Sequence, residues 1–269
     1  MRIGNEQIAF SRTLYTKNQT AIEKSLGRLS TGSKLHQASE NAAGITISEK
    51  MRAQIRGLSR AQLNMNDGLS ALETMDEGMK NISDLVHRAR ELAVMTSTDT
   101  INDEDRKIAQ HELDQVLTTI DDTANNMEFN TRKILKDQDP LKIQIGANSL
   151  QTITVNVLTA DTKTLGLDNL SISTSEEANE AIETIDQAVA TLSMKLTEVG
   201  TKMQSIEHHL RNASVFEENL TRALNELEST DMPGEFMNFV QMDIRQNGDQ
   251  LLIRQVNSNM HELLTLFRS

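Results

Sequence analysis

The stretch ANEAIETIDQAVATLSMKLTEVGTKMQSIEHHLRNASVFEENLTRALNEL, residues 178–227, decides the fold class of this chain. Counted from its first residue in alternating steps of four and three, fourteen of fifteen positions are apolar, and Glu217 is the exception. This spacing over about seven heptads without proline predicts a coiled-coil helix about 75 Å long. Ser175 is expected to cap its start, and Pro233-Gly234 to mark its far end.

A second apolar stripe lies in the N-terminal half, where apolar residues recur every seven positions. Its members are Met51, Leu58, Met65, Leu72, Met79, Val86 and Ala93. The other half of this seam is less pure, because it contains Ile55 and Leu69 but also Gln62 and Asp76. One stripe needs another to cover it, so we expect the two long helices to pair in antiparallel orientation.

Shorter elements are predicted between these two helices. A third helix from about Asp103 to Met127 is expected to join the pair as a bundle through Ile108, Val116, Leu117 and Ile120. Apolar and polar residues alternate on both sides of a Gly/Asn/Ser cluster in residues 141–157, which predicts a β-hairpin. The connector 158–175 has no clean period and predicts a loop with at most one short strand or helical turn.

The two ends of the chain, residues 1–30 and 235–267, are compatible with helices but lack a stripe that would cover them. Their apolar residues include Ile8, Leu14, Ile22, Leu26 and Leu29 at one end, and Phe236, Val240, Leu251, Leu252, Leu263, Leu264 and Phe267 at the other. An isolated amphipathic helix of this length is marginal in water. We therefore expect both ends to become fully ordered only on assembly.

The composition argues against several classes of protein. The 269 residues carry a net charge of −12 and include no cysteine and only 3% aromatic residues. An acidic surface repels nucleic acid and acidic membranes, so neither is an expected partner. Without cysteine there is no disulfide framework and no thiolate metal site. No run approaches the ~18 apolar residues that span a bilayer, and the start MRIGNEQIAF lacks the apolar core of a cleaved signal peptide.

Histidines are the remaining candidates for a metal site, and their spacing does not suit one. A zinc-binding helix needs a second histidine four residues after the first, and neither His111 nor His261 has one. The neighbours His208 and His209 point about 100° apart on a helix. The chain also lacks a nucleophile elbow and a phosphate-binding glycine loop. The sequence therefore predicts no enzyme, no metal and no cofactor.

Several segments resemble the flagellin family in matching order and spacing. They are SLGRLSTGSKLHQASENAAGITISEKMRAQIRGL at 25–58, RARELAV at 88–94, EFNTRKIL at 128–135, IQIGANSLQTITVNV at 143–157 and FEENLTRALNELESTDMPGEFMNF at 216–239. The resemblance covers about residues 1–157 and 176–269, which is nearly the whole chain. It implies a structural subunit that assembles with identical copies into the bacterial flagellar filament for swimming motility.

The resemblance also implies a layered architecture and a route out of the cell. Residues 1–33 and 235–269 would form the inner coiled coil of the filament core, and residues 44–230 a helical bundle with the hairpin. The short connector would stand where many flagellins carry large outer domains, so the chain looks like a minimal member. Expected partners are an export chaperone, the filament cap and hook-associated proteins. The expected location is the extracellular filament, reached through the flagellar type III apparatus without a cleaved signal peptide.

Two sets of site residues follow from the resemblance. The assembly helices would contribute Ile22, Leu26, Leu29, Phe236, Leu251, Leu252, Leu263 and Phe267. The second set, Arg88, Leu92 and Glu112, matches the face by which some flagellins activate Toll-like receptor 5 of a host. Arg88 and Leu92 are four residues apart, so a helix would place a cation beside an apolar anchor. The same face is expected to pack mainly against neighbouring subunits.

Two alternatives stay open at this point. Pro233 and the charged residues Arg245, Asp249 and Arg254 depart from the family pattern, which leaves room for the related hook–filament junction protein. A cytoplasmic signalling coiled coil of the chemoreceptor type also uses long antiparallel helices. The hairpin predicted at 141–157 and the lack of an apolar span argue against the second alternative.

Overall fold

A computed structural model describes residues 2–35, 41–136, 139–156 and 159–266 of the protein, without the side chains of residues 2–8, 260 and 262–266. The elements in chain order are α1 (Arg2–Thr31), α2 (Ala42–Thr96), α3 (Asp103–Asn126), β1 (Glu128–Phe129), β2 (Arg132–Lys133), β3 (Leu141–Gln144), β4 (Thr152–Val155), α4 (Thr162–Leu165), α5 (Ser175–Glu228) and α6 (Met232–Leu266). The predicted class, mainly α with long helices and a small hairpin, is confirmed. Two compact units are present: a terminal unit, Met1–Ala53 with Asn219–Ser269, and a bundle unit, Gln54–Glu218.

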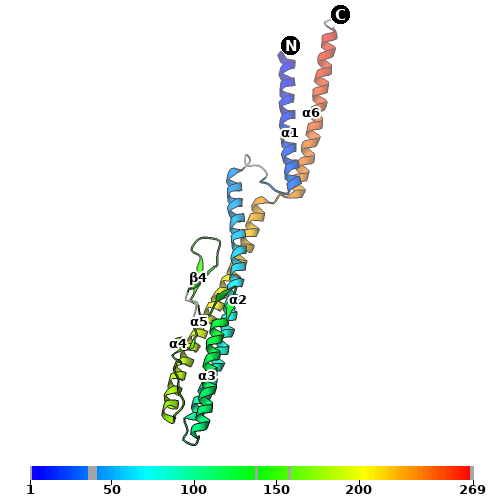
Figure 1. Cartoon of the computed structure of the whole chain (residues 1–269). Helices are drawn as coiled ribbons and strands as arrows, with labels where there is room; N and C mark the ends of the chain where they lie inside the picture. The colour runs from blue at the N-terminus through cyan, green and yellow to red at the C-terminus, as the bar shows by residue number, and fades with distance from the viewer. Residues whose placement is uncertain (1, 36–40, 137–138, 157–158, 267–269) are drawn as a thin grey trace. The chain divides into compact units, whose positions relative to one another are not determined.

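In the bundle unit, α2 and α5 run antiparallel, as the two stripes predict (Figure 1). Gln62 Nε2 donates to Glu217 Oε2 at 2.6 Å, and Arg90 Nε donates to Asp186 Oδ1 at 2.6 Å. Residue numbers therefore fall along α5 as they rise along α2. The heptad positions of α5 that point into the core are buried: Ala178, Ile185, Leu192, Val199, Ile206 and Ala213.

The core face of α2 is wider than the sequence predicts. The predicted stripe is buried from Leu58 to Ala93, but a second line at 61, 68, 75, 82, 89 and 96 is buried as well. The half-seam that runs through Gln62 and Asp76 is only partly covered, as its mixed composition suggests. The core face is wider than predicted because α2 is covered by α5 and also by α3 and the hairpins.

The third helix forms within one residue of its predicted end, and it packs antiparallel to α2. Asn102 caps its start by accepting from the Asp105 N–H at 2.8 Å. Its buried residues are Ala109, Leu113, Val116, Ile120 and Ala124. The predicted stripe is wrong at Ile108, whose side chain is 64% exposed. The buried residues Ala109 and Leu113 are one helical turn apart, and Ile108 lies beside the face that they define.

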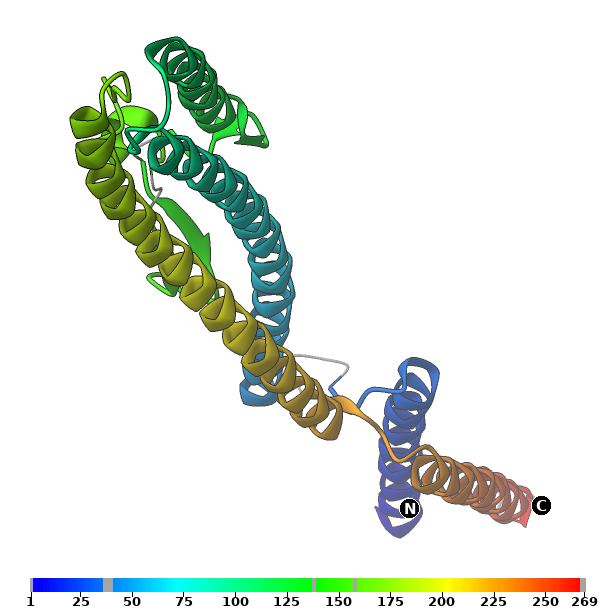
Figure 2. The same ribbon diagram turned by 90° about the horizontal axis from the view of Figure 1, so that it is seen from below.

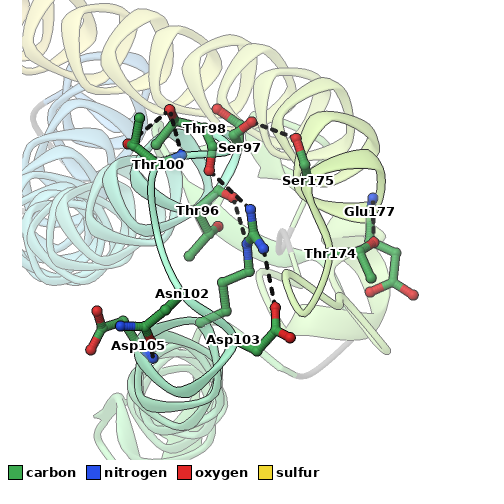
Figure 3. Close-up of polar contacts among 11 residues, drawn as sticks. Thr96, Ser97, Thr98, Thr100, Asn102, Asp103, Asp105, Thr174, Ser175 and Glu177 are labelled. Carbon is green, nitrogen blue, oxygen red and sulfur yellow. Dashed lines mark hydrogen bonds and ion pairs between the residues drawn. The ribbon is translucent and has the colours of Figure 1, made fainter.

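The start of α5 corrects the predicted cap. Thr174 Oγ1, rather than Ser175, accepts from the backbone N–H of Glu177, at 3.2 Å (Figure 3). Ser175 Oγ instead donates to the carbonyl oxygen of Ser97 at 2.6 Å, which ties the start of α5 to the end of α2. Because Thr174, one residue earlier, accepts from one of the free N–H groups of the first turn, the Ser175 hydroxyl is available for this tertiary contact.

The predicted hairpin is confirmed as β3 paired antiparallel with β4, with Ile143 opposite Ile153. It lies against both α2 and α5 (Figure 2). Glycines on α2 make room for it, since Gly57 faces Ala147 and Gly68 faces Ile143. A smaller hairpin, β1–β2, was not predicted from the residue pattern. Its two-residue turn is formed by Asn130 and Thr131, both with positive φ.

The connector is held to the bundle by polar contacts at several points. It contains the single helical turn α4, as the sequence allows. Gln110 clamps it by donating to the Leu170 carbonyl at 3.1 Å and accepting from the Ile172 N–H at 2.7 Å. Lys195 Nζ donates to the Thr159 carbonyl at 3.1 Å, and burial in this position lowers the pKa of Lys195.

In the terminal unit, α1 and α6 lie side by side and antiparallel (Figure 1). We predicted that Pro233-Gly234 marks the end of α5, but both residues lie in the first turn of α6. Proline is tolerated there because the N–H groups of the first turn have no partner within the helix. The segment after α1 and the segment before α6 are joined by an isolated antiparallel β-bridge between Ser33 and Ser229. Arg52 and Glu228 form an ion pair at 2.7 Å in the same unit. The start of α2, up to Ala53, and the end of α5, from Asn219, belong to this unit.

Candidate functional site

The seam between α1 and α6 combines half-buried apolar side chains with polar contacts between the two helices. Asn18 Nδ2 donates to Asp249 Oδ2 at 2.6 Å, and Gln250 Nε2 approaches the Tyr15 hydroxyl at 3.4 Å. Near the other end of the pair, Ser25 Oγ donates to the Glu235 carbonyl oxygen at 3.4 Å. Each hydrogen bond of this kind contributes only about 0.5–1.5 kcal/mol of net stability.

Many large apolar side chains of the same pair are nevertheless exposed. On α1 the exposed ones are Phe10, Leu14 and Leu26, at 66%, 36% and 54% exposure. On α6 they are Met232, Phe236, Met237, Val240, Ile244, Leu251 and Leu252. Many large apolar side chains therefore stay exposed although the two helices are paired. So many exposed large apolar side chains on one pair of helices indicate an interaction surface.

Part of this surface has the spacing of a second coiled-coil seam on α6, which we call the outward seam. Met237, Val240, Ile244, Asn247 and Leu251 follow one another in steps of three and four, and all five are exposed. The apolar members are 65%, 38%, 65% and 65% exposed, with Asn247 the one polar position. A stripe with this spacing fits a facing helix, and within this chain α1 lies on the other side of α6.

The predicted assembly residues divide between the two faces of the pair. Ile22 and Leu29 are half-buried in the seam, whereas Leu26, Phe236, Leu251 and Leu252 are exposed. The side chain of Leu263 and all of Phe267 lie outside the described residues. The prediction missed Phe10, Met237 and Ile244. A heptad count through Val240 would have found the two on α6, whereas no short-range pattern marks Phe10.

A second candidate surface lies on α2 beside α3. Arg88 Nε donates to Glu112 Oε1 at 2.9 Å, and its Nη1 donates to Glu91 Oε2 at 2.9 Å. Hydrogen bonding to Glu112, more than to Glu91, raises the pKa of the Arg88 guanidinium. The structure therefore brings Arg88 and Glu112 together on the surface, both about half exposed.

The third predicted member of that surface is not exposed. Leu92 is only 2% exposed, so the expected apolar anchor beside Arg88 is absent there. Leu92 belongs to the buried face of α2, and its spacing from Arg88 could not reveal this. The exposed apolar side chains nearby are Val94 and Met95, each 46% exposed, and they line a shallow hollow with His87, Arg90 and Glu91.

Over the described ranges, no group of three His, Asp or Glu side chains is arranged to hold a metal ion. The same part of the chain contains no helix that is both long and apolar enough to cross a bilayer.

Comparisons with known proteins agree on one family. A model of the bacterial flagellin N-terminal helical region matches residues 5–139, and a model of the bacterial flagellin C-terminal helical region matches residues 182–267. The chain belongs to the flagellin family. Among flagellins, that of Halalkalibacterium halodurans is 32% identical over 249 residues, which cover 91% of this chain and 92% of the relative. The flagellin of Bacillus subtilis strain 168 is 30% identical over the full length of both chains.

A solved structure supports the same family. The crystal structure of Bacillus cereus flagellin is 27% identical and aligns with a TM-score of 0.52, covering 56% of this chain and 88% of that one. Flagellins are structural proteins that polymerise into the extracellular filament of the flagellum. This chain is accordingly a structural subunit of the bacterial flagellar filament. None of these matches favours the hook–filament junction protein or the chemoreceptor alternative.

Proposed function

We propose that the outward apolar face of the α1–α6 pair is the surface by which each flagellin subunit joins its neighbours. The observation that carries this proposal is the row of apolar side chains that stays exposed on the side of α6 away from α1, from Met237 to Leu251. Contact with other copies would remove this apolar area from water, which is worth about 25 cal/mol per Å² before ordering costs. In this proposal residues 1–33 and 235–269 form the inner filament layer, and residues 44–230 the layer around it.

Seeded elongation of the full chain on filament fragments tests the proposal. Ile244→Lys places a charge in the outward seam and should abolish elongation, because the seam could then be covered only by burying that charge. Asn238→Lys is the matched control, because Asn238 is also exposed on α6 but lies outside the seam. Both variants should keep the thermal stability of the bundle unit. Normal elongation by Ile244→Lys would refute the assignment of this face.

We also propose, on the family resemblance, that the subunit leaves the cell through the flagellar type III apparatus without a cleaved signal peptide. An export chaperone would cover the C-terminal helix before export, and the cap and hook-associated proteins would meet the subunit during assembly. The exposed apolar side chains of α6 support a need for such cover in the free chain. The test is whether a chaperone co-purifies with the full chain. The chaperone should no longer co-purify when residues 250–269 are deleted. No catalytic activity is proposed.

A contact with Toll-like receptor 5 is a further proposal for the face that carries Arg88 and Glu112. Its support is that both side chains are exposed and that Val94 and Met95 add exposed apolar area close by. Because the same face would pack against neighbouring subunits, only free subunits would present it. Receptor activation by monomer and by intact filament, compared at equal mass, tests this: equal activation by both would count against it.

A further inference from the structure

Methionine supplies almost all of the readily oxidised side chains in this protein. The chain has 13 methionines and one tyrosine, and it has neither cysteine nor tryptophan. The structure separates the methionines by exposure. Met65, Met75 and Met79 in the bundle core are at most 1% exposed, whereas Met237 in α6 is 65% exposed and Met194 in α5 is 66% exposed. A small oxidant in solution therefore reaches Met237 and Met194 long before the bundle core.

Met237 occupies a position where a change of polarity has consequences. It is the first residue of the outward seam, and Val240 and Ile244 follow it along the helix face. The rings of Phe236 and Phe239, on either side of it in sequence, have their centroids 6.5 Å apart. A thioether is flexible and apolar, so it can fill the irregular space between this cluster and a facing helix.

We propose that Met237 is an oxidative modification site that controls whether a free subunit can enter the filament. Oxidation of its sulfur blocks entry, and neighbouring copies protect the same sulfur once the subunit is incorporated. The inference rests on the proposed function, in which neighbouring copies cover the outward seam. It adds a chemical control to that seam and identifies hydroperoxides as the class of reactant.

The reaction with hydrogen peroxide is an oxygen transfer. The sulfur lone pair of Met237 attacks one peroxide oxygen, an S–O bond forms and the O–O bond breaks. The proton on the transferred oxygen moves to the departing oxygen, which leaves as water. The sulfur loses two electrons and the peroxide gains them. The sulfoxide is a strong hydrogen-bond acceptor, and placing it opposite apolar side chains without a donor is unfavourable.

A partition experiment on the unmodified sequence tests the proposal. Monomer is oxidised by hydrogen peroxide until about half of Met237 is sulfoxide, the peroxide is removed, and filament seeds are added. Peptide mass mapping then compares pellet and supernatant. Met237 sulfoxide should be depleted from the pellet by about tenfold or more, which is about 1.4 kcal/mol. Equal partition, or depletion that follows Met194 sulfoxide instead, would overturn the proposal.

Two variants and one protection measurement complete the test. After oxidation, Met237→Leu should still elongate seeds, while the matched variant Met194→Leu should lose elongation as the wild type does. Loss of elongation in oxidised Met237→Leu would overturn the proposal. In finished filaments Met237 should oxidise about tenfold more slowly than in monomer, and an equal rate would also overturn it. Failure of the untreated wild type to elongate would instead refute the proposed function itself.

Discussion

Replacing Gly57 by alanine tests whether the β3–β4 turn presses directly on α2. A Cβ atom added at Gly57 would lie 2.7 Å from Ala147 Cβ and 3.1 Å from Ala147 Cα. The first separation is shorter than real Cβ contacts, and the second requires a backbone atom to shift by a few tenths of an ångström. The turn would therefore have to move away from the helix. Gly200 on α5 is the matched control, because a Cβ there meets no atom within 4 Å.

The expected magnitudes follow from two opposing effects. Alanine in a helix interior is more stable than glycine by about 1 kcal/mol, and this gain applies at both positions. Overpacking costs about 1–3 kcal/mol, and this penalty applies only at Gly57. Gly200→Ala should therefore be about 1 kcal/mol more stable than the wild type. Gly57→Ala should range from about equal to the wild type to about 2 kcal/mol less stable.

Thermal unfolding followed by circular dichroism measures both variants. A change of 1 kcal/mol shifts Tm by about 2–4 °C in a domain of this size. Hydrogen exchange in residues 145–151 should accelerate in Gly57→Ala and stay unchanged in Gly200→Ala, because only the first displaces the turn. If both variants gain stability equally and exchange is unaffected, the turn does not depend on the missing side chain of Gly57.

Four further outcomes are expected. Leu150 has φ of 68° and a side chain that is 95% exposed, so Leu150→Gly should raise the unfolding free energy by about 1 kcal/mol in urea titration; a loss of stability would contradict the strain. Hydrogen bonding from Thr164 lowers the pKa of Asp161. The ionised Asp161 carboxylate therefore stabilises the folded state fully above its unfolded pKa of about 3.9, and this contribution is lost as the pH falls through the lower folded pKa. Tm should therefore fall more steeply below pH ~4 in the wild type than in Asp161→Asn, and parallel curves would rule this out. Arg88→Ala should reduce receptor signalling by monomer about tenfold without a change in Tm, whereas Leu92→Ala should lower Tm by creating a cavity; normal signalling by Arg88→Ala would remove the receptor role. Because the net charge is −12, the rate of seeded elongation near neutral pH should rise with salt, and a rate independent of ionic strength would show that repulsion is not limiting.

The candidate sites could be predicted only in part, for reasons that differ between them. The outward role of Leu26, Phe236, Leu251 and Leu252 was expected because uncovered apolar residues on a helix need a partner. Leu92 was misplaced because two residues that lie four apart on the same side of a helix can differ in burial. On α2, the Arg88 side chain is about half exposed, whereas Leu92 is buried in the core. Helical spacing gives neighbours, and only the position of the packed partner gives burial.

The sequence by itself determined the long helices, their antiparallel pairing, the β3–β4 hairpin and the membership of a filament-forming family. These features follow from local periodicity and short motifs, which are complete within one segment of chain. The tertiary structure decided the second buried line on α2, since it arises only where α3 and the hairpins cover that helix. It also decided which side of α6 faces α1. Apolar residues lie around much of α6, so no single stripe defines its inner face, and the polar contacts of Asn18 and Ser25 with the helix leave Met237 and Ile244 facing outward.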